Sequence, residues 1–140
     1  MNDTIFPGAQ GQSIIYACNR DVTETTAIIE QELADKGIPA FARFDHDKNA
    51  AGVNLELRPT RVIVFGAPAV GTLLMHANQS VALELPLRVA VWETPEGQVY
   101  LATQSMDSLA AAYGLEGEPA LETMRSLLYA LATKAAGIDS

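Results

Sequence analysis

The sequence is poor in cysteine, in basic side chains and in aromatic residues. Cys18 is the only cysteine among 140 residues, which excludes an intramolecular disulfide and a zinc site built on several thiolates. Nine lysines and arginines stand against 17 aspartates and glutamates, for a net charge of −8, and aromatic residues make up 6% of the chain. Because phosphate backbones are bound mainly through clustered cations, we expect no nucleic acid partner.

Long hydrophobic runs are also missing. The longest apolar stretch, residues 62–75, contains two glycines and a proline and is shorter than the roughly 20 residues of a membrane-spanning helix. The N-terminus carries neither the basic region nor the apolar segment of a secretory signal. We therefore expect a cytoplasmic protein without membrane contact, with residues 1–12 as a flexible lead and residues 13–140 as one domain.

The sequence does contain enough apolar material for one core. Hydrophobic residues make up 49% of the chain, and a chain of this length buries roughly two-thirds of its unfolded surface. Alternating or β-branched runs predict strands, and apolar spacing of three to four residues predicts helices. The predicted strands are 13–19, 40–45, 55–58, 61–65, 87–93 and 98–103, and the predicted helices are 21–36, 47–53, 69–78, 105–113 and 119–136. This pattern indicates an α+β fold: a largely antiparallel sheet of about five strands, helices packed mainly on one face, and a C-terminal helix.

Local signals place several of these elements. Asp21 and Glu24 have the spacing of a capping box, and Gly37 supplies a left-handed helix exit. Residues 94–97 predict the turn of a hairpin, and the run 61–65, apolar on both parities, is expected inside the sheet. The last helix carries an apolar face that would lie on the sheet or on a second subunit, made of Leu121, Met124, Leu128 and Leu131.

The first group of candidate site residues follows the second predicted strand. A carboxylate beside an imidazole can orient it or raise its pKa, so Asp45 makes His46 a candidate general base or metal ligand. The alternative is that Asp45 caps the next turn and His46 is a half-buried polar residue, because successive strand residues point to opposite faces. Glu56 and Arg58, two apart on a predicted strand, form either a site for a carboxylate or an exposed ion pair.

The second group lies where a buried strand turns into a helix. Free backbone amides at the start of the helix, after the turn at Gly66 and Pro68 and with Gly71 and Thr72 nearby, are a candidate anion site. The segment lacks the lysine of a Walker A loop and the glycine spacing of a dinucleotide fingerprint. The alternative is a packing turn that requires small residues.

Soft metal ligands are present but scattered. They are Cys18, His46, Met75, His76 and Met106, which show no ligand spacing. We therefore predict no metal site, and metal or haem binding stays an alternative. Cys18 lies in an apolar strand and is expected to be an inert buried thiol.

Several ordered motifs resemble those of a known family. They are Phe44-Asp45-His46, the run Leu-Glu-Leu-Arg-Pro-Thr that ends at Thr60, the segment from Phe65 to Met75, and Leu85-Pro86-Leu87. Over residues 13–115 the sequence resembles the domain of unknown function family 302. The resemblance implies a small α+β domain, typically dimeric, with no established activity. Ala67 stands where that family commonly has asparagine, so an amide donor is missing from the Gly66 turn.

These observations lead to competing hypotheses for function. The first is a noncatalytic homodimeric module that binds a small anionic ligand or a protein partner. Its candidate binding residues are Asp45, His46, Glu56, Arg58, Thr60, Gly66, Pro68, Gly71, Thr72 and Met75. An anionic ligand is favoured because cations gather near the first group, at Arg43, Lys48, Arg58 and Arg61.

The alternatives are an enzyme, a metal or haem binding protein, and a structural dimer. The enzyme would use His46 as acid or base, with Asp45 or Glu56 behind it and Arg58 holding the substrate. Metal or haem would bind through His46, His76 or Met75. The structural dimer would form through the apolar face of the last helix.

Overall fold

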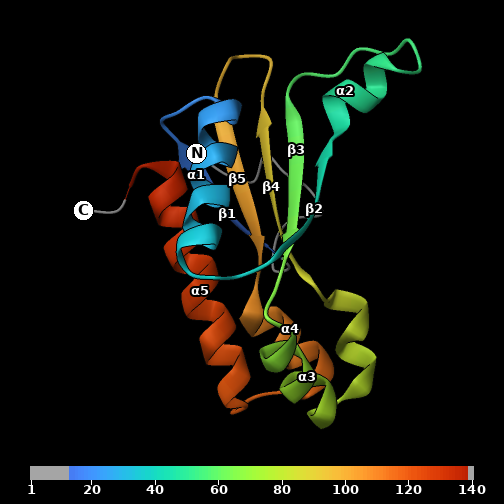
Figure 1. The fold of residues 1–140 in the computed structure, drawn as a ribbon, viewed down its shortest axis with the longest axis vertical. Coiled ribbons are helices and arrows are strands. Elements are labelled where there is room, and N and C mark those ends of the chain that lie inside the picture. The colour runs from blue at the N-terminus through green and yellow to red at the C-terminus, as the bar shows by residue number, and fades with distance from the viewer. Residues whose placement is uncertain (1–12, 139–140) are drawn as a thin grey trace.

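The fold is the predicted α+β arrangement. The computed structural model describes residues 13–138 and contains one antiparallel sheet of five strands, in the order β1-β5-β4-β3-β2 (Figure 1). The strands are β1 (Ser13–Cys18), β2 (Ala40–Asp45), β3 (Thr60–Phe65), β4 (Leu87–Glu93) and β5 (Val99–Gln104). The lead expected at residues 1–12 lies outside the described residues.

Residues 13–138 also contain five α-helices and one 3₁₀ helix. They are α1 (Val22–Asp35), α2 (His46–Ala51), α3 (Pro68–Ala77), the 3₁₀ helix η2 (Gln79–Glu84), α4 (Met106–Tyr113) and α5 (Pro119–Ala136). The long helices α1 and α5 lie side by side over one face of the sheet (Figure 1). The α2 segment extends beyond one end of the sheet, while α3, α4 and η2 gather at the other end.

The core lies between the sheet and the layer formed by α1 and α5. Strands β3, β4 and β5 bury alternate residues against these helices, among them Phe65, Val91 and Leu101. All four apolar residues on the predicted face of α5 are buried: Leu121, Met124, Leu128 and Leu131. That face therefore packs inside the chain's own core and is not open to a second subunit.

The helix ends follow the capping signals of the sequence. The Asp21 carboxylate accepts a hydrogen bond from the backbone N–H of Glu24 at 2.7 Å, which satisfies one unpaired donor of α1. The Ser105 hydroxyl accepts one from the N–H of Ser108 at 3.2 Å, at the start of α4. Gly37, with φ +68°, takes the left-handed conformation just after α1.

The strand predicted at residues 55–58 is wrong. This segment is an irregular loop in which Leu55 and Leu57 are exposed. Its neighbour in sequence, β3, already has β2 on one side and β4 on the other, and the segment does not pair with the outer edge of β2. Glu56 and Arg58 therefore do not share the face of a strand.

Candidate functional site

The structure separates the candidate residues into two groups at opposite ends of β3. The first group, with Asp45, His46 and Thr60, lies where β3 begins; the second follows Phe65, where β3 ends. Six strand residues span about 17 Å, because each step along a strand advances roughly 3.4 Å. The ten candidate residues therefore do not share one pocket among residues 13–138: the second group lines one cavity, and Glu56, Arg58 and Thr60 line another.

The second group lines an apolar cavity of about 490 Å³ between α3, η2 and α5. Five predicted residues belong to its wall: Gly66, Pro68, Gly71, Thr72 and Met75. The wall is completed by Ile38, Phe41, Ala67, Val70, Ala82, Leu85, Pro86, Leu87, Thr123, Met124 and Leu127. Among the described residues of the wall, the hydroxyl side chains are those of Thr72 and Thr123, and none is ionisable. A cavity of this kind suits an apolar molecule and not an anion.

Small residues let the chain turn closely around this cavity. Pro68 is the first residue of α3, where its fixed φ fits and its missing N–H costs no hydrogen bond. A side chain at Gly66 would approach Phe41 and Pro86, and one at Gly71 would approach Leu85, in each case at 3.7 Å. These are ordinary van der Waals distances, so space does not require glycine at either position, and the second group forms part of the cavity wall.

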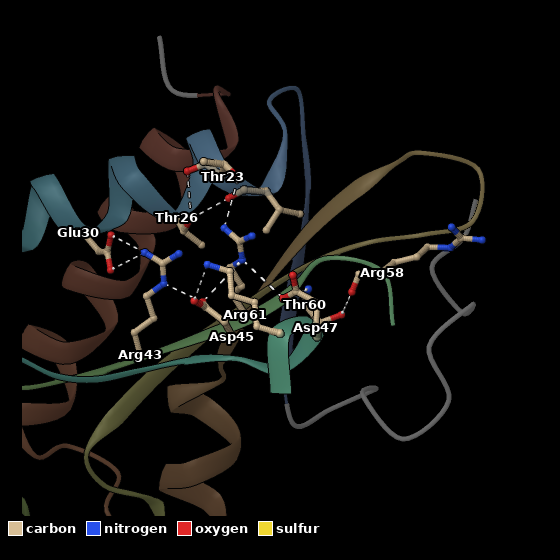
Figure 2. Close-up of polar contacts among 11 residues, drawn as sticks. Thr23, Thr26, Glu30, Arg43, Asp45, Asp47, Arg58, Thr60 and Arg61 are labelled. Carbon is tan, nitrogen blue, oxygen red and sulfur yellow. Dashed lines mark hydrogen bonds and ion pairs between the residues drawn. The ribbon is translucent and has the colours of Figure 1, made fainter. Parts of the chain in front are cut away.

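Asp45 and Thr60 of the first group belong to a polar cluster beneath α1 (Figure 2). Arg61 is buried, and its Nε lies 3.7 Å from Asp45 Oδ1 and 3.6 Å from Asp47 Oδ1. Arg61 Nη1 donates a hydrogen bond to the Thr23 hydroxyl at 3.3 Å. Asp47 also accepts a hydrogen bond from the N–H of Thr60 at 3.2 Å. Arg61 therefore links three elements: α1, the end of β2 and the start of α2.

Asp45 is held as an anion by three cations. Arg43 Nε donates to its Oδ1 at 2.8 Å, Lys48 Nζ lies 3.7 Å from its Oδ2, and Arg61 contributes the third contact. The hydrogen bond from Arg43 is the main reason that the pKa of Asp45 is lowered from its ordinary value of 3.8. Arg43 also pairs with Glu30 on α1 at 3.3 Å. The cations expected to attract an anionic ligand are thus largely neutralised by carboxylates of the chain itself.

The residues proposed for acid–base chemistry do not converge. The ring of His46 stacks on Phe44, with 6.1 Å between ring centroids, while the carboxylate of Asp45 is engaged with the cations. Glu56 and Arg58 lie on the exposed loop, and in Figure 2 the Arg58 side chain points away from the cluster. What Arg58 contributes to the cluster is its backbone carbonyl, which accepts a hydrogen bond from the Thr60 hydroxyl at 2.8 Å.

The soft metal ligands are equally dispersed. Met75 lines the cavity, Met106 is buried at the start of α4, and Cys18 ends β1. Burial raises the pKa of the Cys18 thiol to about 11, as expected for an inert side chain. Within residues 13–138 no three His, Cys, Asp or Glu side chains are grouped closely enough to hold a metal ion.

Sequence reasoning missed the wall opposite the Gly66 turn. Phe41, Thr123 and Leu127 come from β2 and α5, which are distant in sequence from α3. The Leu85-Pro86-Leu87 motif was a usable signal, because Leu85 and Pro86 lie in the cavity wall.

Comparison with known proteins supports one family. The family described as "Domain of unknown function DUF302" matches residues 14–132. Proteins named fluoride-specific ion channel FluC 1 from Brucella suis biovar 1 and FluC 2 from Brucella melitensis biotype 1 are each 34% identical over 105 residues, or 74% of this chain. The matched part makes up 41% and 39% of those proteins, so the chain corresponds to about two-fifths of their length.

A solved structure has the same fold. The crystal structure of an uncharacterized conserved DUF302 protein from Bacillus stearothermophilus superimposes with a TM-score of 0.68 at 16% identity, covering 90% of this chain and 96% of that one. Among the helices of residues 13–138, none has the length and apolar character needed to cross a membrane.

Proposed function

This chain belongs to the DUF302 family, and we propose that it is a noncatalytic, cytoplasmic, homodimeric module that binds one small apolar molecule per chain. The observation that carries the proposal is the cavity of about 490 Å³ beside α3. Its size lies within the roughly 300–1,000 Å³ of ordinary small-molecule sites, and its wall is almost wholly apolar. Five of the ten candidate residues line it.

The chemistry of the wall favours binding over catalysis. General acid–base catalysis needs a titratable group within hydrogen-bond reach of the reacting atoms, and this wall contains none. A charged ligand would lose its hydration without gaining a counter-ion, which costs several kcal/mol. The preferred ligand is therefore neutral, with an apolar body and at most one polar group near the hydroxyls of Thr72 or Thr123.

A neutral fluorescent probe tests the proposal. We expect N-phenyl-1-naphthylamine to bind the wild-type protein saturably, one molecule per chain, with increased emission. Gly71→Leu places a side chain into the cavity wall and should weaken binding at least tenfold. Leu73→Ala is the matched control, since Leu73 lies on the same helix, is 58% exposed and is not part of the wall. Binding that does not saturate, or that Gly71→Leu leaves unchanged, would contradict the proposal.

The relatives suggest a second candidate function. Because matching proteins are named fluoride-specific ion channels, we also propose that this domain responds to fluoride as an accessory part of such a system. A ligand at 100 times its Kd stabilises a folded protein by about 2.7 kcal/mol. The thermal unfolding temperature should therefore rise with sodium fluoride above its value in sodium chloride of equal ionic strength. Identical temperatures in the two salts would reject direct fluoride binding.

A further inference from the structure

The face of the sheet opposite α1 and α5 is broad and apolar. Its central row runs Phe44, Val62, Ala90, Ala102 and Ile15, one residue from each of the five strands, as the strand registers show. None of these five side chains is buried, and Phe44 is 45% exposed. A flat apolar face of this extent on a globular protein usually marks an interaction site.

The charge pattern on this face differs from that of the whole chain. The neighbouring rows on the same face contain Ser13, Ala17, Ala42, Thr60, Val64, Arg88, Trp92, Tyr100 and Gln104. These positions and the central row include one cation and no acidic side chain, although the chain carries 17 aspartates and glutamates. Few carboxylates therefore meet when two copies of an acidic protein approach here: Glu84 pairs with Arg88 at 3.8 Å, and Asp47, Glu56 and Glu93 line the cleft beside Trp92.

The segment 46–59, which we name the arm, extends the face at one end. It comprises α2 and the loop that returns to β3, and it projects beyond the sheet in Figure 1. Leu55 and Leu57 of the arm line an open cleft of about 940 Å³ together with Trp92 of the face. Val53 and Leu55 are each 65% exposed and Leu57 is 49% exposed. The arm thus adds aliphatic surface next to the open face.

The area matches what a stable dimer requires. Five strands spaced about 4.8 Å apart, four of six residues and one of seven, give a face of roughly 24 by 20 Å, or about 480 Å². Each aliphatic side chain of the arm adds on the order of 100 Å². The combined surface comes close to the roughly 800 Å² per partner of a standard interface.

We propose that two copies of this chain associate through these open sheet faces, with the arms widening the contact. The inference rests on the homodimer of the proposed function and names its surface. The central alanines, Ala90 and Ala102, allow two sheets to approach at the roughly 10 Å spacing of packed sheets. A lipid surface fits less well, because anionic membranes attract clustered cations and this face has only Arg88.

Charge substitutions at the centre of the face test the proposal. Sedimentation velocity should give twice the mass of one chain for the wild type, and the mass of one chain for Ala90→Glu and for Ala90→Lys separately. Mixing these two variants should restore a dimer, because opposite charges then meet across the interface. Leu73→Glu on the exposed side of α3 is the matched control and should stay dimeric.

The outcomes separate this surface from the proposed function. If Ala90→Glu remains dimeric, the open face is not the interface, although the homodimer survives. If the wild type is a monomer, whether the face is free or covered by residues 1–12, both this inference and the homodimer are overturned. Probe binding in the cavity should be unchanged in Ala90→Glu. If that variant does not fold, Val62→Thr, which only exchanges a methyl for a hydroxyl, should raise the dimer Kd at least tenfold; an unchanged Kd would overturn the inference.

Discussion

Replacing Gly71 with alanine should stabilise the protein while weakening ligand binding. Gly71 lies inside α3, where glycine costs about 0.5–1 kcal/mol relative to alanine because it loses more backbone entropy on folding. A β-carbon at this position would meet Leu85 Cδ1 at 3.7 Å, an ordinary van der Waals contact, so no clash offsets the gain. We expect the free energy of unfolding to rise by about 0.5–1 kcal/mol and Tm by roughly 2–4 °C.

Urea denaturation and calorimetry measure this effect, and Gly137→Ala provides the contrast. Gly137 has φ +81°, and a β-carbon there would collide with the side chain of Asn19, which donates a hydrogen bond to the Gly137 carbonyl at 3.2 Å. That substitution should cost about 1–3 kcal/mol. Because the methyl group of Gly71→Ala enters the cavity wall, the Kd for N-phenyl-1-naphthylamine should rise as stability rises. A Gly71→Ala protein that is less stable than the wild type would refute the reasoning about space in this wall.

Three further predictions follow from burial and charge. Leu128→Asp buries a carboxylate at a position 3% exposed and should lower the free energy of unfolding by more than about 3 kcal/mol in urea titration, instead of yielding a folded monomer. Because folding lowers the pKa of Asp45, its carboxylate stabilises the folded state above pH 3.8, and this stabilisation is lost as the pH falls through the pKa of the folded state. The urea midpoint of Asp45→Asn should therefore change less with pH below about pH 4 than that of the wild type. Folding raises the pKa of Cys18 from 9.0 to about 11, so the free energy of unfolding of the wild type should fall between these pH values. The Cys18→Ala protein should lack this fall. Iodoacetamide should label the native thiol slowly at pH 8.

The helices could be predicted well because their signals are local. Asp21 and Ser105 cap helices through residues three positions away, and a glycine just after a helix sets the left-handed exit within the same turn. Such contacts depend on a few consecutive residues, which a sequence displays directly. The same holds for the β4–β5 hairpin, whose turn at residues 94–97 contains Gly97 at φ +88°.

Strand pairing could not be predicted in the same way. Leu55 to Arg58 alternates as a strand does, but whether a strand forms depends on a free edge elsewhere in the sheet. The strand nearest in sequence, β3, offers no free edge because β2 and β4 flank it, and within residues 13–138 the segment does not pair with the outer edge of β2. The alternating pattern carries neither fact.

The separation of the candidate residues into two groups, by contrast, can be predicted from the length of the strand between them. The run 61–65 was recognised as a strand, and Arg58 and Gly66 lie before and after it. A strand of five residues holds its two ends roughly 14 Å apart, so groups flanking it do not share a small pocket. The cavity itself could not be foreseen, because Thr123 and Leu127 reach it only through the packing of α5.

The polar residues of the first group are best explained by their contacts at the two points where the arm joins the sheet. The chain leaves the sheet at Asp45 and returns at Thr60, and both points are fixed by the same few side chains. Asp47 accepts the N–H of Thr60 and lies beside Arg61, while Arg61 also faces Asp45. Because Arg61 is buried, removing either carboxylate would leave its charge less compensated and loosen the arm. The charged residues near His46 therefore fix the two ends of the arm, and the cavity for which we propose a small molecule lies at the other end of β3.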